Sequence, residues 1–463
     1  MALIKSISGI RGTIGGAIGD NLTPQDIVAC TAAFGHWTMQ KTGKNTIVIG
    51  RDARISGELV SSLVCSTLRA LGINVIDLGL STTPTVEMIV PLENAAAGII
   101  LTASHNPKQW NALKLLNAKG EFISAQDGEE VLALIDSPEI LYAEVDKIGG
   151  YTQRTDAIAY HIDRILELPL VDLAAVQARK FKVVLDSVNS TGSISMTPLL
   201  ERMGCEVVQI NDEPNGKFAH NPEPLPENLQ ELANAVTTHR ADLGIAVDPD
   251  VDRLVLVNED GSMFGEEYTL VAISDYVLKH KKGNTVSNLS STRALRDVTE
   301  KHGGNYFAAA VGEVNVVTMM KTQNAVIGGE GNGGIIYPDL HYGRDSMVGI
   351  ALFLSHLAHF GNSASFLRSK YPNYTMSKNK ITLTPDIDLD ALFTGLEKKY
   401  NKQPINTIDG LKIEFDNDWV HLRRSNTEPI IRIYAEGSSE VTVENLVQKI
   451  KSDVAMLLRG EAI

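Results

Sequence analysis

The sequence is poor in the features that mark secreted, disulfide-bonded or membrane-embedded proteins. It contains only 3 cysteines among 463 residues, none in a CxxC spacing, which argues against a disulfide framework and a cysteine-based zinc site. No stretch approaches the roughly 20 apolar residues of a membrane-spanning helix. The first residues, MALIKSISGIRG, lack the apolar segment of a secretory signal. We therefore expect a cytoplasmic protein without a membrane partner.

Positive charge is also scarce. Lys and Arg number 42 against 56 Asp and Glu, and the resulting net charge of −14 argues against a nucleic-acid partner. A chain this acidic can bind an anionic substrate only where its basic residues gather locally. The apolar content of 43% is ordinary for a globular enzyme. At about 150 residues per domain, the length predicts three or four domains. Nothing in the sequence indicates an oligomeric state.

The order of apolar segments predicts four units. Short runs rich in β-branched residues alternate with amphipathic stretches in three successive blocks, which is typical of layered α/β domains. The last part of the chain instead has closely spaced, antiparallel-type strands and a terminal helix. We expect three similar mixed α/β domains, at 1–150, 151–255 and 256–370, and a C-terminal α+β domain at 371–463. The polar, proline-bearing stretch near 370–380 is the expected linker.

The segment AAAGIILTASHNP, residues 95–107, is the first candidate for chemistry. Its uncharged half predicts a buried strand, which would deliver Ser104, His105 and Asn106 at the strand's exposed end. A serine hydroxyl in such a place suits a nucleophile or a phosphoryl carrier. Taken alone, the segment is better explained as a simple turn closed by the serine or asparagine side chain.

The segment GIAVDPDVDR, residues 244–253, carries Asp248, Asp250 and Asp252 after an apolar strand. In extended backbone this spacing places all three carboxylates on one side, where they repel unless a cation neutralises them. Oxygen ligands favour Mg²⁺ or Ca²⁺. An EF-hand is excluded because Arg253 stands where its loop needs glycine. A solvated acidic turn remains the alternative.

The glycine-rich segment GGEGNGG, residues 328–334, allows a ligand to approach the backbone closely. Glu330 and Asn332 in it could bind sugar hydroxyls. A phosphate loop of the P-loop type is excluded because no Lys-Ser or Lys-Thr follows. A flexible turn accounts for this segment equally well.

Basic residues gather in LRRSNTEPIIR, residues 422–432. Guanidinium groups there stand beside hydroxyl and amide donors, a combination that suits a phosphate. The donors are Arg423, Arg424, Ser425, Asn426 and Thr427. Arg11 in SGIRG and Arg51 in GRDARISG could also reach an anion. A pair of surface arginines remains the alternative interpretation.

Taken together, SGIRG near residue 8, TASHNP, the DxDxDR loop and RxSNTEP near residue 430 occur in one order along nearly the whole chain. This combination resembles the α-D-phosphohexomutase family, which includes phosphoglucomutase, phosphomannomutase and phosphoglucosamine mutase. The resemblance implies four domains, each giving one loop to a central cleft. It also implies an isomerase that transfers a phosphate between C6 and C1 of a sugar phosphate, through a phosphoserine and a bisphosphorylated intermediate.

The resemblance assigns roles to individual residues. It implies that Ser104 is the phosphoserine and that Asp248, Asp250 and Asp252 hold Mg²⁺ together with an oxygen of that phosphoserine. Lys114 falls where a general base is proposed in the family. The other basic residues of the implied site are Arg11, His105 and Arg253. The implied sugar ligands are Glu330 and Asn332, and the implied phosphate ligands are Arg423, Ser425, Asn426, Thr427 and Arg432.

The sequence departs from the family pattern at three places. Asn111-Ala112 replaces a frequent Asn-Gly, Ala310 replaces a basic residue, and Gly334 stands where some members have a cleft histidine. We expect conversion of glucosamine 6-phosphate to glucosamine 1-phosphate, with mannose or glucose phosphate as the alternative and a bisphosphorylated sugar as activator. Two other classes remain open: a phosphatase that hydrolyses its phosphoserine, and a non-catalytic sugar-phosphate sensor.

Overall fold

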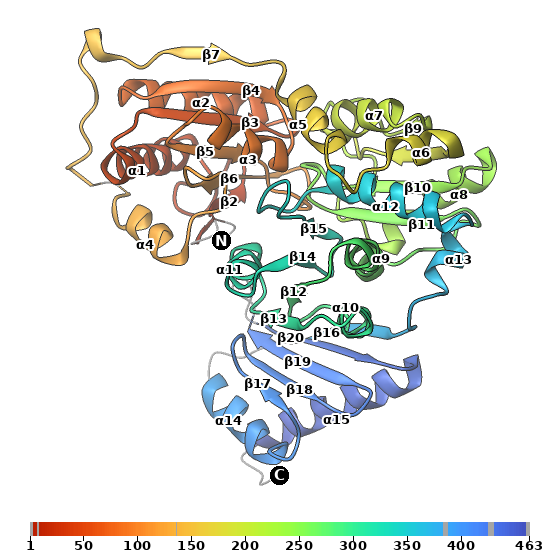
Figure 1. The fold of residues 1–463 in the computed structure, drawn as a ribbon. Helices are drawn as coiled ribbons and strands as arrows, with labels where there is room; N and C mark the ends of the chain where they lie inside the picture. Colours follow the sequence, from red (N-terminus) through yellow and green to blue (C-terminus); the bar gives the residue numbers. More distant parts are fainter. Residues whose placement is uncertain (1–2, 7–8, 136, 383–387, 425–429, 460–463) are drawn as a thin grey trace.

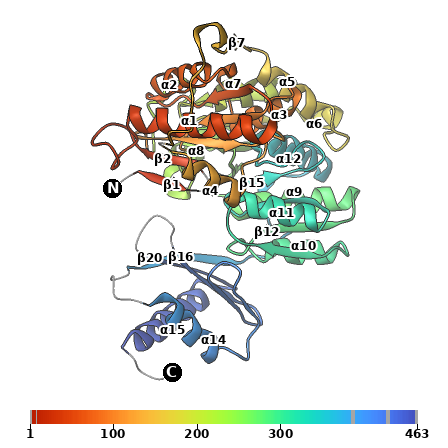
Figure 2. The same cartoon turned by 90° about the vertical axis from the view of Figure 1, so that its left-hand side faces the viewer.

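The computed structural model describes residues 3–6, 9–135, 137–382, 388–424 and 430–459 (Figure 1). Four β-sheets follow one another along the chain, each with its own helices. In both views the C-terminal part lies beneath the third unit (Figures 1 and 2). The fold class predicted from the sequence is confirmed.

The first unit is a seven-stranded mixed sheet in the order β1-β2-β6-β5-β3-β4-β7. Its strand β3 shows why both faces are covered, because alternate residues enter different cores. Ile47 and Ile49 pack with α1 and α2, whereas Val48 packs with α3 on the opposite face. The strands are β1 Ile4–Ser6, β2 Gly9–Thr13, β3 Thr46–Arg51, β4 Asn74–Leu80, β5 Ala97–Leu101, β6 Trp110–Leu116 and β7 Tyr151–Gln153. The helices are α1 Pro24–Thr42, α2 Gly57–Ala70, α3 Thr83–Leu92 and α4 Ala125–Ala133, followed by the short 3₁₀ turn η1 Val145–Lys147.

The second and third units repeat one pattern: three parallel strands and a fourth that is antiparallel, in the orders β11-β10-β8-β9 and β13-β12-β14-β15. The strands are β8 Lys182–Asp186, β9 Glu206–Ile210, β10 Leu243–Val247, β11 Leu254–Asn258, β12 Asn284–Asn288, β13 Tyr306–Ala309, β14 Ala325–Glu330 and β15 Gly334–Ile336. The helices are α5 Ala157–Leu166, α6 Leu173–Arg179, α7 Gly192–Arg202, α8 Gln230–His239, α9 Glu266–His280, α10 Ala294–Lys301, α11 Glu313–Thr322, α12 Ser346–Phe360 and α13 Ala364–Arg368, with the 3₁₀ turn η2 Pro226–Asn228. A single apolar cluster runs through both units, so they share a core.

The fourth unit is a five-stranded antiparallel sheet, in the order β16-β20-β19-β18-β17, with two helices and a separate core. The elements are β16 Thr375–Thr382, α14 Leu389–Lys399, β17 Ile405–Asn406, β18 Leu411–Glu414, β19 Trp419–Arg424, β20 Ile430–Gly437 and α15 Glu440–Leu458. The expectation of a linker across 370–380 was wrong in its second half. Residues from Thr375 onward pair with β20 along a full strand, because an edge strand accepts polar residues on its exposed side.

Two strands extend past the expected domain bounds. β7 pairs with β4 of the first sheet beyond residue 150, and β11 continues to Asn258 beyond residue 255. None of the helices in the described parts of the chain combines the length and the apolar character that a membrane crossing requires.

Candidate active site

Ser104 lies three residues beyond the last residue of β5, in a loop that turns sharply. Its backbone has a φ of 50°, in the left-handed region that a non-glycine residue enters at a cost of about 1–2 kcal/mol. The hydroxyl donates to Asp248 at 2.7 Å, and His105 Nδ1 lies 3.3 Å from it. The expectation of an exposed strand end was wrong, because the loop of Asp248 covers Ser104 and leaves it only 7% exposed.

The Ser104 loop is held by Arg54, which the sequence analysis did not single out. Arg54 is buried, and its Nε donates to Asp52 at 3.0 Å. Its two terminal nitrogens donate, over 2.5 to 3.0 Å, to the backbone carbonyls of Ser104, Asn106, Pro107 and Trp110. The guanidinium of Arg54 therefore fixes the loop through backbone carbonyls of the loop and makes no hydrogen bond to the serine hydroxyl. The neighbouring Arg51, which was predicted to reach an anion, instead donates to the carbonyl of Asp52.

Asp248, Asp250 and Asp252 are fully buried, and their carboxylates gather within 4.8 Å of one another. They converge in a turn after β10 and not in extended backbone as predicted. Val251 has a φ of 62°, and its N–H donates to the carbonyl of Asp248 at 3.1 Å. The amides of Asp252 and Arg253 both donate to Asp248 Oδ1 at 3.1 Å. The loop thus folds around its first carboxylate.

Two oxygens of this group suit a cation. Oδ1 of Asp250 and Oδ1 of Asp252 are buried and have no hydrogen-bond partner among the described residues. An unpartnered buried charge is costly, and a hard cation would supply the missing partner. Burial, followed by the charges of Asp252 and Asp250, raises the pKa of Asp248 well above its ordinary value. The three carboxylates can therefore hold a metal ion.

A second group of potential metal ligands, His161, His341 and Asp345, differs in this respect. His161 bonds Thr85 through Nδ1 and Asp345 through Nε2, at 3.0 and 2.9 Å. The other oxygen of Asp345 caps α12 by accepting the amides of Met347 and Val348. Hydrogen bonds therefore account for this cluster without a cation.

Lys114 and His105 flank the carboxylates in opposite protonation states. Lys114 Nζ lies 2.7 Å from Asp250 Oδ2 and 3.3 Å from Asp252 Oδ2. Burial lowers the pKa of Lys114, but these two carboxylates outweigh burial and raise it above its usual value. Burial and the nearby Arg253 hold the pKa of His105 well below its usual range. At neutral pH the lysine is charged and the imidazole is neutral.

Glu330 ends β14 in the glycine-rich segment and points to the same region. Its Oε1 accepts from Asn288 Nδ2 at 2.8 Å and from the amide of Gly312 at 3.1 Å. Its Oε2 accepts from Arg344 at 2.9 Å. Asn332 is used within its own turn, since Oδ1 accepts from the amide of Gly334. The Glu330 side chain is therefore held in place from three sides.

Arg344, a further residue that the sequence analysis missed, links two of the predicted loops. It donates to Asp252 at 2.7 Å as well as to Glu330. No motif marks it, and it stands 92 positions from Asp252 in the chain. The only sequence signal for Arg344 was its position in the triplet Gly343-Arg344-Asp345, directly before a helix.

Apart from the basic residues around the carboxylates, a second basic group contains arginines from both the first and the fourth unit. Arg423 and Arg432 are direct cross-strand partners in β19 and β20, and Arg423 also pairs with Asp409 at 3.2 Å. Burial, and then the charge of Arg432, lower the pKa of Arg11 in β2, so the two units bring arginines together. Like charges placed opposite one another repel, and Asp409 offsets part of this positive charge at Arg423. These three arginines form a local concentration of basic residues in an otherwise acidic chain.

The predicted phosphate ligands Ser425, Asn426 and Thr427 lie outside the described residues. They belong to the connection between β19 and β20, whose ends carry Arg423 and Arg432.

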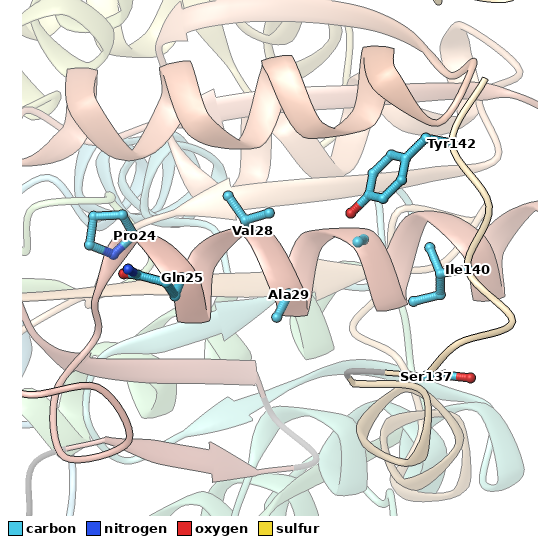
Figure 3. A pocket seen from close by; sticks show the side chains of 8 residues that line it. Pro24, Gln25, Val28, Ala29, Ser137, Ile140 and Tyr142 are labelled. Atoms are coloured by element: carbon cyan, nitrogen blue, oxygen red, sulfur yellow. The ribbon is translucent and has the colours of Figure 1, made fainter. Parts of the chain in front are cut away.

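A hollow of about 540 Å³ lies beside α1 (Figure 3), and none of its lining residues belongs to these loops. Pro24, Val28, Ala29 and Ile140 give it an apolar lining, and Asp, Glu, Lys, Arg and His are absent from the lining residues. Because this hollow has no charged or titratable Asp, Glu, Lys, Arg or His in its lining, we place the candidate active site at the carboxylates instead.

The order of units and loops matches known protein families. Models described as phosphoglucomutase/phosphomannomutase α/β/α domains I, II and III match residues 4–140, 159–261 and 265–374, and the C-terminal domain model matches 385–452. The chain belongs to the phosphoglucomutase/phosphomannomutase family. The family predicted from the motifs is thereby confirmed.

Relatives in this family match over nearly the whole chain. A probable phosphoglucosamine mutase from Methanopyrus kandleri is 33% identical, with 95% of both chains covered. A phosphoglucomutase/phosphomannomutase from Thermococcus kodakarensis is 35% identical, covering 93% of this chain and 94% of the relative. The crystal structure of a phosphoglucomutase/phosphomannomutase family protein from Burkholderia thailandensis superposes with a TM-score of 0.85 at 25% identity, covering 99% and 98% of the two chains.

The buried pair Arg54–Asp52 gives a stability prediction. Replacing Arg54 with Met leaves a buried carboxylate unpaired and should destabilise the first unit by about 3–5 kcal/mol. Hydrogen exchange of the β3 and β5 amides measures this change. Arg202→Met is the control, because the Arg202–Asp163 pair is exposed and should contribute at most about 1 kcal/mol. Equal effects of the two substitutions would contradict the assignment of Arg54.

Proposed function

We propose that this chain catalyses reversible transfer of a phosphoryl group between C6 and C1 of a hexose phosphate, with Ser104 as carrier. The observation that supports the proposal most is the hydrogen bond from Ser104 Oγ to Asp248, within a buried carboxylate group that has two unpartnered oxygens. Phosphoryl transfer needs little covalent work from a protein beyond positioning and neutralisation of charge. Both requirements are met around this serine.

The reaction has two transfer steps. In the first, phospho-Ser104 gives its phosphoryl group to the free hydroxyl of the bound sugar monophosphate: the bond from phosphorus to Oγ breaks and a bond to the sugar oxygen forms. The resulting bisphosphate turns over, and its other phosphoryl group returns to Ser104. A bisphosphorylated sugar acts as activator because it can restore a serine that has lost its phosphate.

The residues of the carboxylate loop fit Mg²⁺, the hard cation that phosphoryl-transfer sites commonly use. Asp248, Asp250 and Asp252 would hold it together with an oxygen of the phosphorylated serine. When bound, Mg²⁺ supplies Lewis-acid polarisation of the transferring group. Arg253 adds positive charge near the same position, since its charge opposes the rise that burial causes in the pKa of Asp248.

The proton of the attacking sugar hydroxyl needs an acceptor. His105 is neutral and lies beside Ser104 Oγ, so it can accept a proton without prior loss of its own. Lys114 is charged as long as its pairs with Asp250 and Asp252 persist. It can act as a base only after those carboxylates are neutralised by the cation. We assign the first role to His105 and a cation-dependent one to Lys114.

The phosphate that is not being transferred is proposed to bind at the second basic group. Arg423 and Arg432 face each other across two strands, and Arg11 approaches from the first unit. Ser425, Asn426 and Thr427 would complete this phosphate site, and Glu330 with Asn332 would contact the sugar between the two ends. Such an arrangement binds a sugar phosphate in either direction.

Glucosamine phosphate is the proposed substrate, since relatives named for phosphoglucosamine match the chain over nearly its full length. A relative named for glucose and mannose phosphates matches about as well. Parallel assays of glucosamine, glucose and mannose 6-phosphates, with Mg²⁺ and the matching bisphosphate, should show the highest kcat/KM for glucosamine 6-phosphate. A higher kcat/KM for mannose or glucose phosphate would contradict this choice of substrate, and steady release of phosphate without a 1-phosphate product would indicate a phosphatase.

Ser104→Ala tests the carrier. The purified protein should contain a fraction heavier by one phosphate, and this fraction should be absent from the variant, together with mutase turnover. Intact-protein mass spectrometry and a coupled assay measure the two effects. The matched control is Ser62→Ala on the exposed side of α2, which should keep both properties. Full turnover by Ser104→Ala would disprove the mechanism.

Asp250→Asn tests the cation site. The substitution removes the charge of a proposed ligand, so the Mg²⁺ concentration for half-maximal activity should rise by at least about tenfold, because even the loss of a group that only supports a ligand typically costs about 10–100-fold in affinity. Asp260→Asn, in the exposed turn after β11, serves as the control. An unchanged Mg²⁺ requirement in Asp250→Asn would show that the carboxylates are structural.

A further inference from the structure

Arg344 occupies a central place among the buried acids. It is 9% exposed and meets three carboxylates from separate segments of the chain. Its terminal nitrogens donate to Asp252 at 2.7 Å and to Glu330 at 2.9 Å, and its Nε donates to Glu313 at 2.9 Å. Glu313 also accepts the backbone amide of Arg344 at 3.2 Å. Both the backbone and the side chain of the arginine are therefore anchored.

The space for this side chain depends on Gly334. A β-carbon at position 334 would overlap the Cδ atom of Arg344. The backbone of Gly334 does not require glycine, because it is absent from the positive-φ residues, unlike Gly333 at 84°. The arginine could move aside only by giving up its hydrogen bonds to the three carboxylates. Gly334 is thus a glycine because Arg344 fills the adjoining space.

We infer that Arg344 is a positioning residue, which aligns the cation-binding carboxylate of Asp252 with the sugar-binding carboxylate of Glu330. The inference deepens the proposed function and rests on it for the roles of those two acids. Gly334 stands where some family members have a cleft histidine, and Arg344 fills the space beside it.

The hydrogen bonds explain how alignment is achieved at Asp252. Arg344 and Lys114 both bind Oδ2, which leaves Oδ1 as the oxygen without a partner. This oxygen is the one available to a cation. Without Arg344 the carboxylate would be held by Lys114 alone, which also holds Asp250 more closely.

The same guanidinium fixes Glu330 from its Oε2 side, while Asn288 and Gly312 hold Oε1. The rigid, planar guanidinium of Arg344 therefore fixes the distance and orientation between Asp252, at the proposed centre of phosphoryl transfer, and Glu330, at the proposed sugar site. Transfer rates depend steeply on such alignment. Lysine offers a single point of positive charge on a flexible stem and cannot span the two acids in the same way.

Arg344→Met and Arg344→Lys test the inference, with two measurements on each variant. Calorimetric titration of the sugar-free protein with Mg²⁺ should show an affinity lowered by about 10–100-fold, as for other supporting groups of metal sites. In the mutase assay at saturating Mg²⁺, kcat should fall by a similar factor, more in the Met variant than in the Lys variant, with a smaller change in KM.

Gly334→Ala should reproduce these losses by displacing the arginine, and it should add little in an Arg344→Ala background, where the space is free. The crowding control is Gly35→Ala in α1, whose β-carbon would lie 2.8 Å from Leu71 Cδ1 in a remote core. That variant should keep the Mg²⁺ affinity and kcat of the wild type.

Two results would overturn the inference. One is an Arg344→Met protein that unfolds at a lower temperature but keeps Mg²⁺ affinity and kcat, which would make the arginine merely structural. The other is equal effects of Gly334→Ala with and without Arg344. If the wild type shows no mutase activity on any of the sugar phosphates, the proposed function fails, while the Mg²⁺ titrations still test the hold of Arg344 on Asp252.

Discussion

The buried negative charge of the carboxylate loop is the constraint on which the rest of the site depends. Three aspartates cannot share a dry space unless positive charge surrounds them. The chain supplies it from three units: Lys114 from β6, Arg253 from the turn itself and Arg344 from the segment before α12. Compensation of this charge therefore also holds the units together. The second and third units share one apolar core, whereas the first is joined to the carboxylates by polar contacts such as those of Ser104 and Lys114.

The loops of the site could be predicted from the sequence because each is a short local pattern. Ser104, the aspartates, Glu330 and Arg423 all stood in motifs, and the structure describes each of them at a strand end or in the turn that follows. The reason given for the aspartates was nevertheless wrong. They converge because Val251 adopts a left-handed backbone, a local conformation that a β-branched residue rarely takes and that no spacing rule predicts.

Arg54 and Arg344 could not be predicted, for a different physical reason. Their partners are carbonyls and carboxylates far away in the chain, and an arginine that neutralises a buried acid has no characteristic neighbours of its own. Gly334 was an indirect sign of Arg344. Its lack of a side chain was visible as a departure from the family pattern, but only the fold shows which residue uses the space.

The distribution of positive charge also favours a mutase over a phosphatase. A phosphatase needs one basic centre, where the transferred group is held and hydrolysed. This chain, with a net charge of −14, maintains two: one around the carboxylates and one where Arg423 and Arg432 lie opposite each other near Arg11. Under the proposed function, the second centre would hold the phosphate that is not being transferred, away from the reacting serine. A sugar that carries phosphate at both ends during the reaction would use both centres.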